Sequence, residues 1–389
     1  MRYTIVTETY PPEINGVALT VQGMELGLRQ RGHEVDLVRP TQMDESRAFR
    51  ENLTPPDGLT VVRGLPLPRY PNLRFGLPCR GRLQKLWQDR RPDAIYVATE
   101  GPLGNSAVNA AKALGIPCIT GFHTRFDHYV ADYGFASLRP LAVRWMRRFH
   151  NRADMTLVPT PGLKRELQEM DFRHPHCLRR AVDCDRFDPA RRSATLRTTW
   201  GLGREDLAVL FVGRIATEKN LELSIDAFRA LQRQRPDARY IWIGDGPMRA
   251  EIAAENPDFI FTGMLRGEEL ATAIASTDLF PFASQSETFG NVTLEAMASG
   301  VPVVAFDYGA AHEFLRSGIH GAVIPLDDDD GFISATCQLG SDDTKRKSMG
   351  GAGRKAMQAL RPEQVAADLD DLFQLLIDRR TQHANVALA

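Results

Sequence analysis

Short apolar runs alternate along the chain with longer stretches in which apolar residues recur every three or four positions. The short runs are bounded by Gly, Pro or polar residues, as buried β-strands are, and the longer stretches have the single apolar face of amphipathic helices. Such alternation predicts an α/β fold with parallel, doubly wound sheets. The expected strands are residues 3–6, 34–39, 94–98, 118–122, 155–158, 207–213, 239–243, 259–261, 278–282 and 302–305, and the main expected helices are 16–31, 103–114, 161–170, 291–299 and 361–380.

The length of 389 residues favours two domains. Residues 188–204 carry several Arg and a Pro, and we expect the linker there. The expected boundaries are 1–190 for the first domain, 191–362 for the second and 363–389 for a final amphipathic helix that crosses back to the first domain.

Composition is that of an ordinary soluble protein, with 43% hydrophobic residues. No run approaches the roughly 20 apolar residues that span a bilayer, and the chain starts directly with a strand rather than a signal peptide. The sequence has five cysteines, an odd number. They are scattered, and no pair has the spacing of a zinc site or of a Cys-x-x-Cys motif. They are expected to be reduced thiols of a cytoplasmic protein.

The net charge of −1 hides an asymmetry between the two halves. Residues 1–190 carry 27 Lys and Arg against 21 Asp and Glu, so the first half is basic and the remainder acidic. A basic half suggests an anionic partner, although charge also varies between domains without functional reason. We find no nucleic-acid motif, because the basic residues are not interleaved with stacking aromatics.

Two stretches of the first half, 69–87 and 138–152, mix Arg with aromatic and aliphatic residues, as interfacial helices do. They predict contact with a membrane surface. The alternative for the second stretch is that Leu141, Trp145 and Phe149, spaced by four, form a core face.

Residues 284–302 carry the strongest chemical signal, a loop followed by a helix. Asn291 is expected to cap the helix, with Glu287, Phe289 and Gly290 in the loop and Glu295 in the first turn. Two carboxylates would then flank a helix N-terminus, where free N–H groups favour a phosphate. That arrangement suits a nucleotide sugar, whereas the alternative is a solvated loop residue and an acid that complements the helix dipole.

Four further residues follow strands at places where ligands bind in such sheets. Gly16 opens a helix after the first strand, His123 follows the strand at 118, and Arg214 and Lys219 stand at a helix start after the strand at 207. An Arg fork and a Lys point charge together suit a diphosphate. Each residue alone has an ordinary alternative, as a turn glycine, a structural histidine or surface cations.

No metal site is expected. The acidic run 327–330 is interpreted as a solvated helix start, because consecutive acids do not face one point, and no Asp-x-Asp or His cluster occurs.

The string Glu-x-Phe-Gly-x-x-x-Leu-Glu at 287–295, followed by Ala-Met-Ala-Ser-Gly-Val-Pro, resembles the donor-site signature of family-four retaining glycosyltransferases. The resemblance is specific at 9–17, 121–129, 213–221 and 284–302, although Thr288 stands where many relatives have Gly. It implies the GT-B fold, two Rossmann-like doubly wound parallel-sheet domains facing a central cleft. The first would be the acceptor side and the second the donor domain.

The resemblance also implies roles for the candidate residues. Glu287 and His123 would hold the donor sugar, and Arg214 and Lys219 the pyrophosphate, which makes these four the catalytic candidates. Gly16, Phe289 and Gly290 would lie beside the phosphates and sugar, Glu295 would bind the ribose, and Gly263, Met264 and Leu265 would meet the base. Asp127 and His128 would touch the acceptor or cap the next helix.

The activity implied is transfer of a hexose from a nucleotide diphosphate sugar to a lipid or glycan acceptor, with retention and no metal or other cofactor. The amino-acid sequence at 8–12, 98–104 and 122–124 resembles that of bacterial GDP-mannose-dependent α-mannosyltransferases, so GDP-mannose is the expected donor. We therefore expect a cytoplasmic enzyme that binds peripherally to an anionic membrane surface. The alternatives are a UDP-hexose donor, a sugar-nucleotide 2-epimerase or a non-catalytic nucleotide-sugar binding module.

Overall fold

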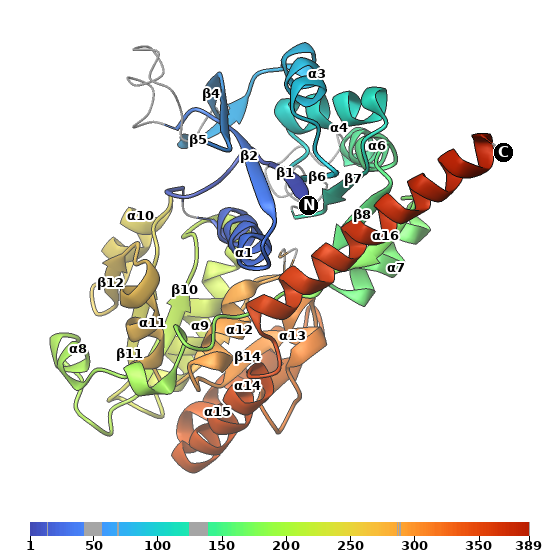
Figure 1. Cartoon of the computed structure of the whole chain (residues 1–389). Coiled ribbons are helices and arrows are strands. Elements are labelled where there is room, and N and C mark those ends of the chain that lie inside the picture. The colour runs from blue at the N-terminus through green and yellow to red at the C-terminus, as the bar shows by residue number, and fades with distance from the viewer. Residues whose placement is uncertain are drawn as a thin grey trace. The chain divides into compact units, whose positions relative to one another are not determined.

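The computed structural model describes residues 1–13, 15–42, 57–67, 70–123, 139–285, 287 and 289–388. Contacts divide these residues into two compact units (Figure 1). The first unit takes in the described residues up to 123, those from 139 to 179, and 362–388, whereas the second takes in those from 180 to 361. The second unit therefore begins about ten residues before the boundary expected from the sequence.

A seven-stranded parallel sheet forms the centre of the first unit, in the order β3-β2-β1-β6-β7-β8-β9. The strands are β1 (Arg2–Val6), β2 (Glu34–Pro40), β3 (Leu59–Val62), β6 (Ala94–Val97), β7 (Cys118–Gly121), β8 (Met155–Val158) and β9 (Pro175–Cys177). The expected strands at the chain start and at 34, 94, 118 and 155 are confirmed.

Successive strand residues of this sheet enter different cores, because side chains alternate between its faces. Tyr3, Ile5 and Tyr96 join one apolar cluster, whereas Val6 and Val97 join another. The helices of the unit are α1 (Gly16–Gln30), α3 (Arg80–Asp89), α4 (Pro102–Leu114), α6 (Arg139–His150), α7 (Pro161–Glu169) and α16 (Pro362–Leu388). The first cluster includes residues of α1 and α16, and the second residues of α3 and α4, so the sheet is doubly wound.

Residues 64–67 and 70–76 fold differently from expectation. They form an antiparallel pair, β4 (Gly64–Leu67) and β5 (Tyr70–Gly76), so part of the basic stretch 69–87 is a strand rather than an interfacial helix. The rest of that stretch forms α3, which buries Leu83 and Trp87 in the core.

The second unit also contains a parallel sheet, built from two three-stranded parts. A parallel bridge between Val209 and Leu279 joins the parts. One part is β10 (Ala208–Val212), β11 (Arg239–Ile243) and β12 (Ile260–Gly263), and the other is β13 (Phe280–Phe282), β14 (Val303–Phe306) and β15 (Gly321–Ile324). The protein thus has an α/β architecture of two Rossmann-like, parallel-sheet domains, as expected.

Helices of the second unit follow its strands in turn. They are α8 (Ala194–Thr199), α9 (Leu221–Gln232), α10 (Arg249–Glu255), α11 (Gly267–Ala275), α12 (Asn291–Ala298), α13 (Gly309–Phe314), α14 (Asp329–Ser341) and α15 (Asp343–Met357), with 3-10 turns η2 (Pro189–Arg191) and η3 (Thr217–Lys219). Asp328 caps α14 through the Gly331 N–H at 2.9 Å, which confirms that the acidic run is a helix start.

The expected linker at 188–204 is instead part of the second unit. Arg197, on α8, is buried and donates to Asp278 Oδ2 at 2.9 Å and to the Ser276 carbonyl at 3.0 Å. Trp200 packs in the core of the unit. These contacts outweigh the loop-like composition of the segment, because hydrogen bonds to both Nη groups of the buried Arg197 hold its helix in place.

Helix α16 returns to the first unit after the chain has completed the second. Its Asp370 accepts hydrogen bonds from Tyr3 Oη at 2.7 Å and Arg31 at 2.9 Å, and lies 3.0 Å from His33 Nε2. Burial alone would raise the pKa of Asp370, but these partners outweigh it and lower the pKa. Where α16 crosses α1, a Cβ on Gly27 would lie 2.4 Å from the Cβ of Ala366, so the helices touch closely because residue 27 is glycine.

Candidate active site

Two loops at the carboxyl edge of the second sheet lie backbone against backbone. The loop after β10 is hydrogen-bonded to the loop after β11, from Gly213 N to the Ile243 carbonyl and from Ile215 N to the Asp245 carbonyl, both at 3.0 Å. A Cβ on Gly244 would lie 1.9 Å from the Gly213 oxygen, and Gly244 has a φ of +141°. Only glycine satisfies both conditions. The loop after β11 therefore supports the loop after β10.

That supported loop carries Arg214, whose position is fixed by Glu218. The Arg214 Nε donates to Glu218 Oε1 at 2.9 Å, and Nη2 bonds the same oxygen. The Glu218 side chain is only 6% exposed, whereas that of Arg214 is 31% exposed. The carboxylate therefore holds the guanidinium from within while the cation stays accessible. Glu218 was not among the sequence candidates.

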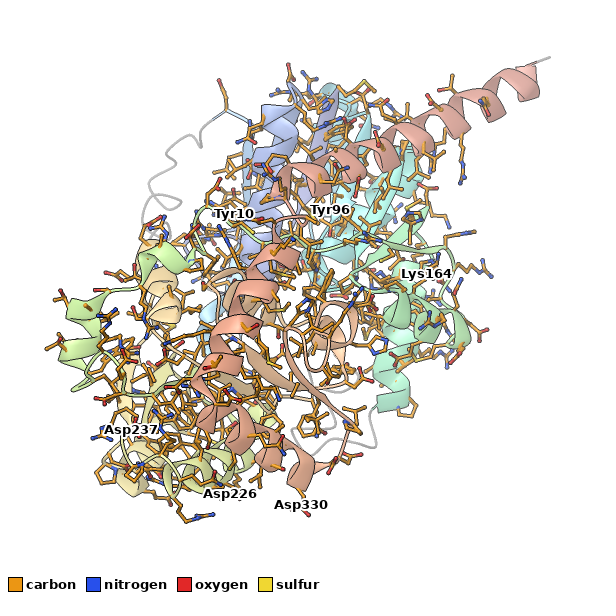
Figure 2. All side chains as sticks on the ribbon, turned by 90° about the horizontal axis from the view of Figure 1, so that it is seen from below. Tyr10, Tyr96, Lys164, Asp226, Asp237 and Asp330 are labelled. Carbon is orange, nitrogen blue, oxygen red and sulfur yellow. The ribbon has the colours of Figure 1, made fainter. Side chains whose placement is uncertain are left out.

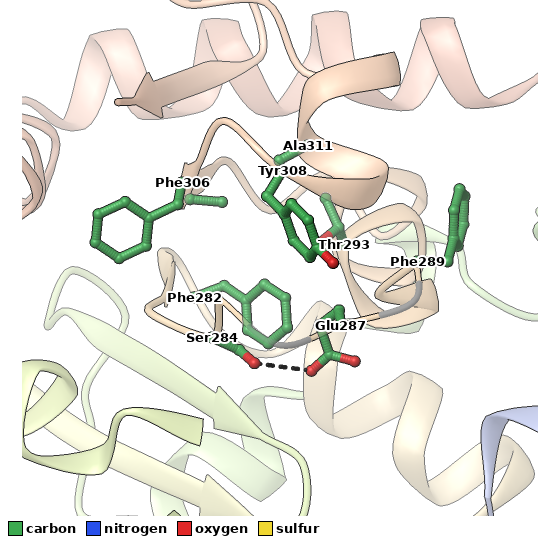
Figure 3. A pocket seen from close by; sticks show the side chains of 9 residues that line it. Phe282, Ser284, Glu287, Phe289, Thr293, Phe306, Tyr308 and Ala311 are labelled. Carbon is green, nitrogen blue, oxygen red and sulfur yellow. Dashed lines mark hydrogen bonds between the residues drawn. The ribbon is translucent and has the colours of Figure 1, made fainter. Parts of the chain in front are cut away.

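Lys219, at the end of η3, forms an ion pair with Glu287 from the loop after β13. Ser284 Oγ donates to the same carboxylate oxygen, Oε1, at 3.0 Å (Figure 3). Burial alone would raise the pKa of Glu287, but Lys219 and Ser284 outweigh it, so the pKa lies below its ordinary value and the group is an anion at neutral pH. Two sequence candidates 68 positions apart are thus brought into contact.

A small pocket lies against Glu287 (Figure 3). Its lining combines aromatic and small residues with three hydroxyl groups: Phe282, Ser284, Glu287, Phe289, Thr293, Ala305, Phe306, Tyr308 and Ala311. Glu287 thus lies among aromatic and hydroxyl-bearing side chains.

Helix α12 begins differently from expectation. Gly290, with a φ of +87°, is the cap residue, no described side chain caps this helix end, and Asn291 is the first helical residue. Gly290 takes the cap position with a left-handed backbone that glycine adopts readily, so Asn291 stands one residue past the cap. The helix then ends before Gly300, which has a φ of +74°.

Glu295 lies in the second turn of α12 rather than the first. It therefore does not complement the helix dipole, an effect confined to the first turn. Burial raises the pKa of Glu295 to about 7, against a lowering influence from Arg186. A half-buried carboxyl with that pKa suits hydroxyl groups, to which either protonation state hydrogen-bonds.

The remaining candidates of the second unit lie at the ends of strands or beside them. Phe289 is buried against Phe314, and its carbonyl accepts the Ala310 N–H at 2.6 Å. Gly263 ends β12 with a φ of +75°. Met264 is 54% exposed, whereas Leu265 packs against the core.

The first unit holds the other two candidates. Gly16 starts α1, whose cap is Asn15, with its side chain accepting the Ala18 N–H at 2.8 Å. His123 follows β7 and is buried, and its Nε2 lies 2.6 Å from the hydroxyl of Tyr96, labelled in Figure 2. Tyr96 was not predicted from the sequence. Asp127 and His128 lie outside the described residues.

Within the described part of the chain, no group of three or more His, Cys, Asp or Glu side chains could hold a metal ion. No described helix is long and apolar enough to cross a bilayer. All five cysteines are free thiols.

Comparisons with known proteins show the family and the fold. Residues 14–186 match the family model "Glycosyltransferase Family 4", and residues 206–342 match "Glycosyl transferases group 1". A GDP-mannose-dependent alpha-mannosyltransferase of Mycolicibacterium smegmatis is 33% identical over 99% of this chain and 100% of its own. A GDP-mannose-dependent alpha-(1-6)-phosphatidylinositol dimannoside mannosyltransferase of Mycobacterium tuberculosis is 28% identical over 82% of each chain. The solved sucrose-phosphate synthase of Thermosynechococcus elongatus superposes with a TM-score of 0.76 at 18% identity, covering 97% of this chain and 99% of that one, which supports the same GT-B fold.

Proposed function

This chain belongs to the family-four glycosyltransferases and transfers a hexose from a nucleotide diphosphate sugar with retention, and we propose that the sugar is mannose and the donor GDP-mannose. The acceptor proposed is a lipid or lipid-linked sugar. The observation that carries the assignment of the donor site is the convergence of Arg214, Lys219 and Glu287, because two cations beside an anchored carboxylate fit a diphosphate next to sugar hydroxyls.

The roles proposed follow from these contacts. Arg214 and Lys219 bind the pyrophosphate, Glu287 accepts sugar hydroxyls, and Glu295 accepts those of the ribose. His123, oriented by Tyr96, holds the sugar. Gly16, Phe289 and Gly290 allow close backbone approach to the phosphates and sugar, and residues 263–265 meet the base.

The proposed reaction is a front-face substitution. The bond from the anomeric carbon to the phosphate oxygen breaks, and the acceptor oxygen bonds that carbon on the same face. The acceptor proton passes to the leaving phosphate. Preorganised cations stabilise the charge that grows on the leaving group, and Arg214, held by Glu218, and Lys219, held by Glu287, are fixed before the donor arrives.

A panel of donors tests the proposal. We expect GDP-mannose to be consumed faster than UDP-glucose, UDP-galactose or UDP-GlcNAc when phosphatidylglycerol vesicles carry diacylglycerol, phosphatidylinositol or a monoglycosyl diacylglycerol. Product release is followed as free nucleoside diphosphate, and sugar transfer by mass spectrometry of the lipid. Preference for a UDP-sugar would overturn the donor, and acceptor-free isomerisation of the sugar would indicate an epimerase instead. Donor binding without turnover would indicate a binding module.

Activity is expected to survive chelation. Because Arg214 and Lys219 supply two positive charges beside the proposed diphosphate, no divalent cation is needed there. The rate in EDTA is compared with the rate in added magnesium or manganese. Loss of activity in EDTA that either metal restores would refute this prediction.

One face of α6 supports the proposal that the acceptor is met at a membrane. Leu141 is 65% exposed and Trp145 44% exposed, and Arg144 and Arg148 lie exposed beside them. Of the three residues that could have formed a core face, Phe149 alone is buried. Two exposed large apolar side chains next to two exposed arginines match the interfacial helices that bind anionic lipid.

Vesicle co-sedimentation tests the membrane contact. Each Arg near an anionic surface contributes about 1 kcal/mol, so replacing Arg144 and Arg148 with Ser should weaken binding by about 30-fold. Binding should need anionic lipid and fall in high salt, because surface charge is screened. Arg204→Ser is the control, since that side chain is 96% exposed and lies on the second unit. Protein that stays in the supernatant with every lipid composition would contradict the proposal.

A further inference from the structure

Glu8 is a buried carboxyl group at the start of the loop between β1 and α1. Its side chain accepts the Gly76 N–H at 2.5 Å and the Leu103 N–H at 2.9 Å, on different oxygens. Its own backbone N–H donates to Thr99 Oγ1 at 2.8 Å. Burial raises the pKa of Glu8 to about 7, while the amides of Gly76, Leu103 and Gly104 act to lower it. One residue of 8% exposure thus joins the β1 loop to the end of β5 and the first turn of α4.

The Glu8 carboxylate lies so close to two glycines that neither position has room for a larger residue. A Cβ on Gly101 would lie 2.1 Å from Glu8 Oε1, and one on Gly76 would lie 3.2 Å from Oε2. Gly101 has a φ of −60°, a conformation open to every residue, so glycine is needed there for space and not for backbone conformation. The cradle is therefore shaped to the carboxylate.

A chain of side-chain hydrogen bonds leads from the residue after Glu8 to the first turn of α1. Thr9 Oγ1 donates to Glu13 Oε2 and accepts from Asn15 Nδ2, both at 2.6 Å. Asn15 in turn caps α1 through the Ala18 N–H. Displacement of Glu8 would move Thr9 and, through it, the cap that precedes Gly16.

We propose that Glu8 is a positioning residue for sugar transfer, which fixes the N-terminus of α1, and so Gly16, relative to the N-terminus of α4. This inference rests on the proposed function, in which the backbone at Gly16 approaches the donor phosphate and the acceptor. Glu8 acts through the loop and does not touch substrate. A displacement of the helix start by about 1 Å from its productive position can lower the rate of transfer by about 10²-fold.

The first test is Glu8→Gln, which keeps the size of the side chain. Glutamine has one oxygen and one NH2 group, so it cannot accept both the Gly76 and the Leu103 N–H. The expected result is a fall of about tenfold or more in kcat for transfer from GDP-mannose to the best lipid acceptor of the panel. The Kd for GDP, measured by calorimetry, should rise by a smaller factor than kcat falls, because both cations proposed to bind the pyrophosphate lie in the second unit and only the backbone at Gly16 lies in the first. Glu34→Gln, at an exposed carboxyl paired with Arg2, is the matched control.

A second variant, Gly101→Ala, displaces the carboxylate without changing its charge. The expected defect matches that of Glu8→Gln, and the double variant should lose little more than either single one, because both changes break one contact set. Normal transfer rates in folded Glu8→Gln, or losses that multiply in the double variant, would overturn the proposal.

Hydrogen exchange separates this inference from the proposed function. In Glu8→Gln the backbone amides of Thr9, Tyr10, Glu13 and residues 15–18 should exchange faster than in wild type and Glu34→Gln, whether or not any acceptor is turned over. Unchanged exchange would overturn the positioning role. Failure of the wild type to use GDP-mannose would overturn the proposed donor while leaving the exchange result interpretable.

Discussion

Replacing Lys219 or Arg214 with alanine is expected to lower turnover by about 10²–10³-fold, the usual cost of removing one preorganised charge contact from a transition state. Lys219→Ala carries a second effect, since the Lys219 ammonium is a partner of the Glu287 carboxylate. Without it, burial raises the pKa of Glu287, so the pH below which activity falls should move upward. Arg214→Ala leaves Glu287 paired with Lys219 and removes only the smaller influence of Arg214 on the pKa of Glu287, so its acid limb should move less than that of Lys219→Ala.

Both variants are measured by initial rates at saturating donor from pH 5 to 9, with circular dichroism to establish folding. Lys347→Ala serves as the control, because Lys347 is exposed on α15 of the same unit. Near-wild-type rates in both Arg214→Ala and Lys219→Ala would show that these cations do not hold the pyrophosphate. If the acid limb shifted equally in the two variants, the fall of activity at low pH would not be due to protonation of Glu287.

Gly244→Ala is expected to destabilise the second unit and to disable the donor site together. The added methyl meets the Gly213 oxygen at 1.9 Å, and the backbone conformation at 244 is one that alanine rarely adopts. Strain and overpacking together cost on the order of 2–5 kcal/mol. Any relief must move residues 213 and 214, so surviving protein should also bind GDP more weakly.

Thermal melting and GDP calorimetry measure the two effects. Gly351→Ala is the matched control, because residue 351 lies in α15 with nothing within 4 Å of an added Cβ. Alanine in a helix should be neutral or stabilising there, by up to about 1 kcal/mol. A variant Gly244→Ala that melts and binds GDP as the wild type does would contradict the support assigned to this glycine.

The strands and helices could be predicted because their apolar periodicity is a local property. The place of residues 188–204 in the second unit could not be predicted in this way. Arg197 is polar and Trp200 is an isolated apolar residue, and both acquire their partners only on folding. The pair β4 and β5 was likewise missed, because Arg and Pro interrupt the alternation of apolar residues at 64–76.

In the candidate active site, too, some residues could be predicted from the sequence and others could not. Lys219 and Glu287 were each predicted through the family resemblance, from separate segments, and the structure brings them into contact. Glu218 and Tyr96 were missed, because nothing in spacing links Tyr96 to His123 or marks Glu218 as the partner of Arg214. The cap at Gly290 depends on one backbone angle, and Asn291 has the better cap side chain of the two by sequence alone.

Helix α16 has a consequence for the order in which the chain folds on the ribosome. It supplies Leu369, Leu372 and Phe373 to the core beside β1 and α1. These residues are translated after every residue of the second unit. The second unit can therefore complete its core while the nascent first unit still exposes an apolar face. A stop codon near residue 361 would leave that face uncovered for good, and the product would be a substrate for chaperones and proteases rather than a shortened enzyme.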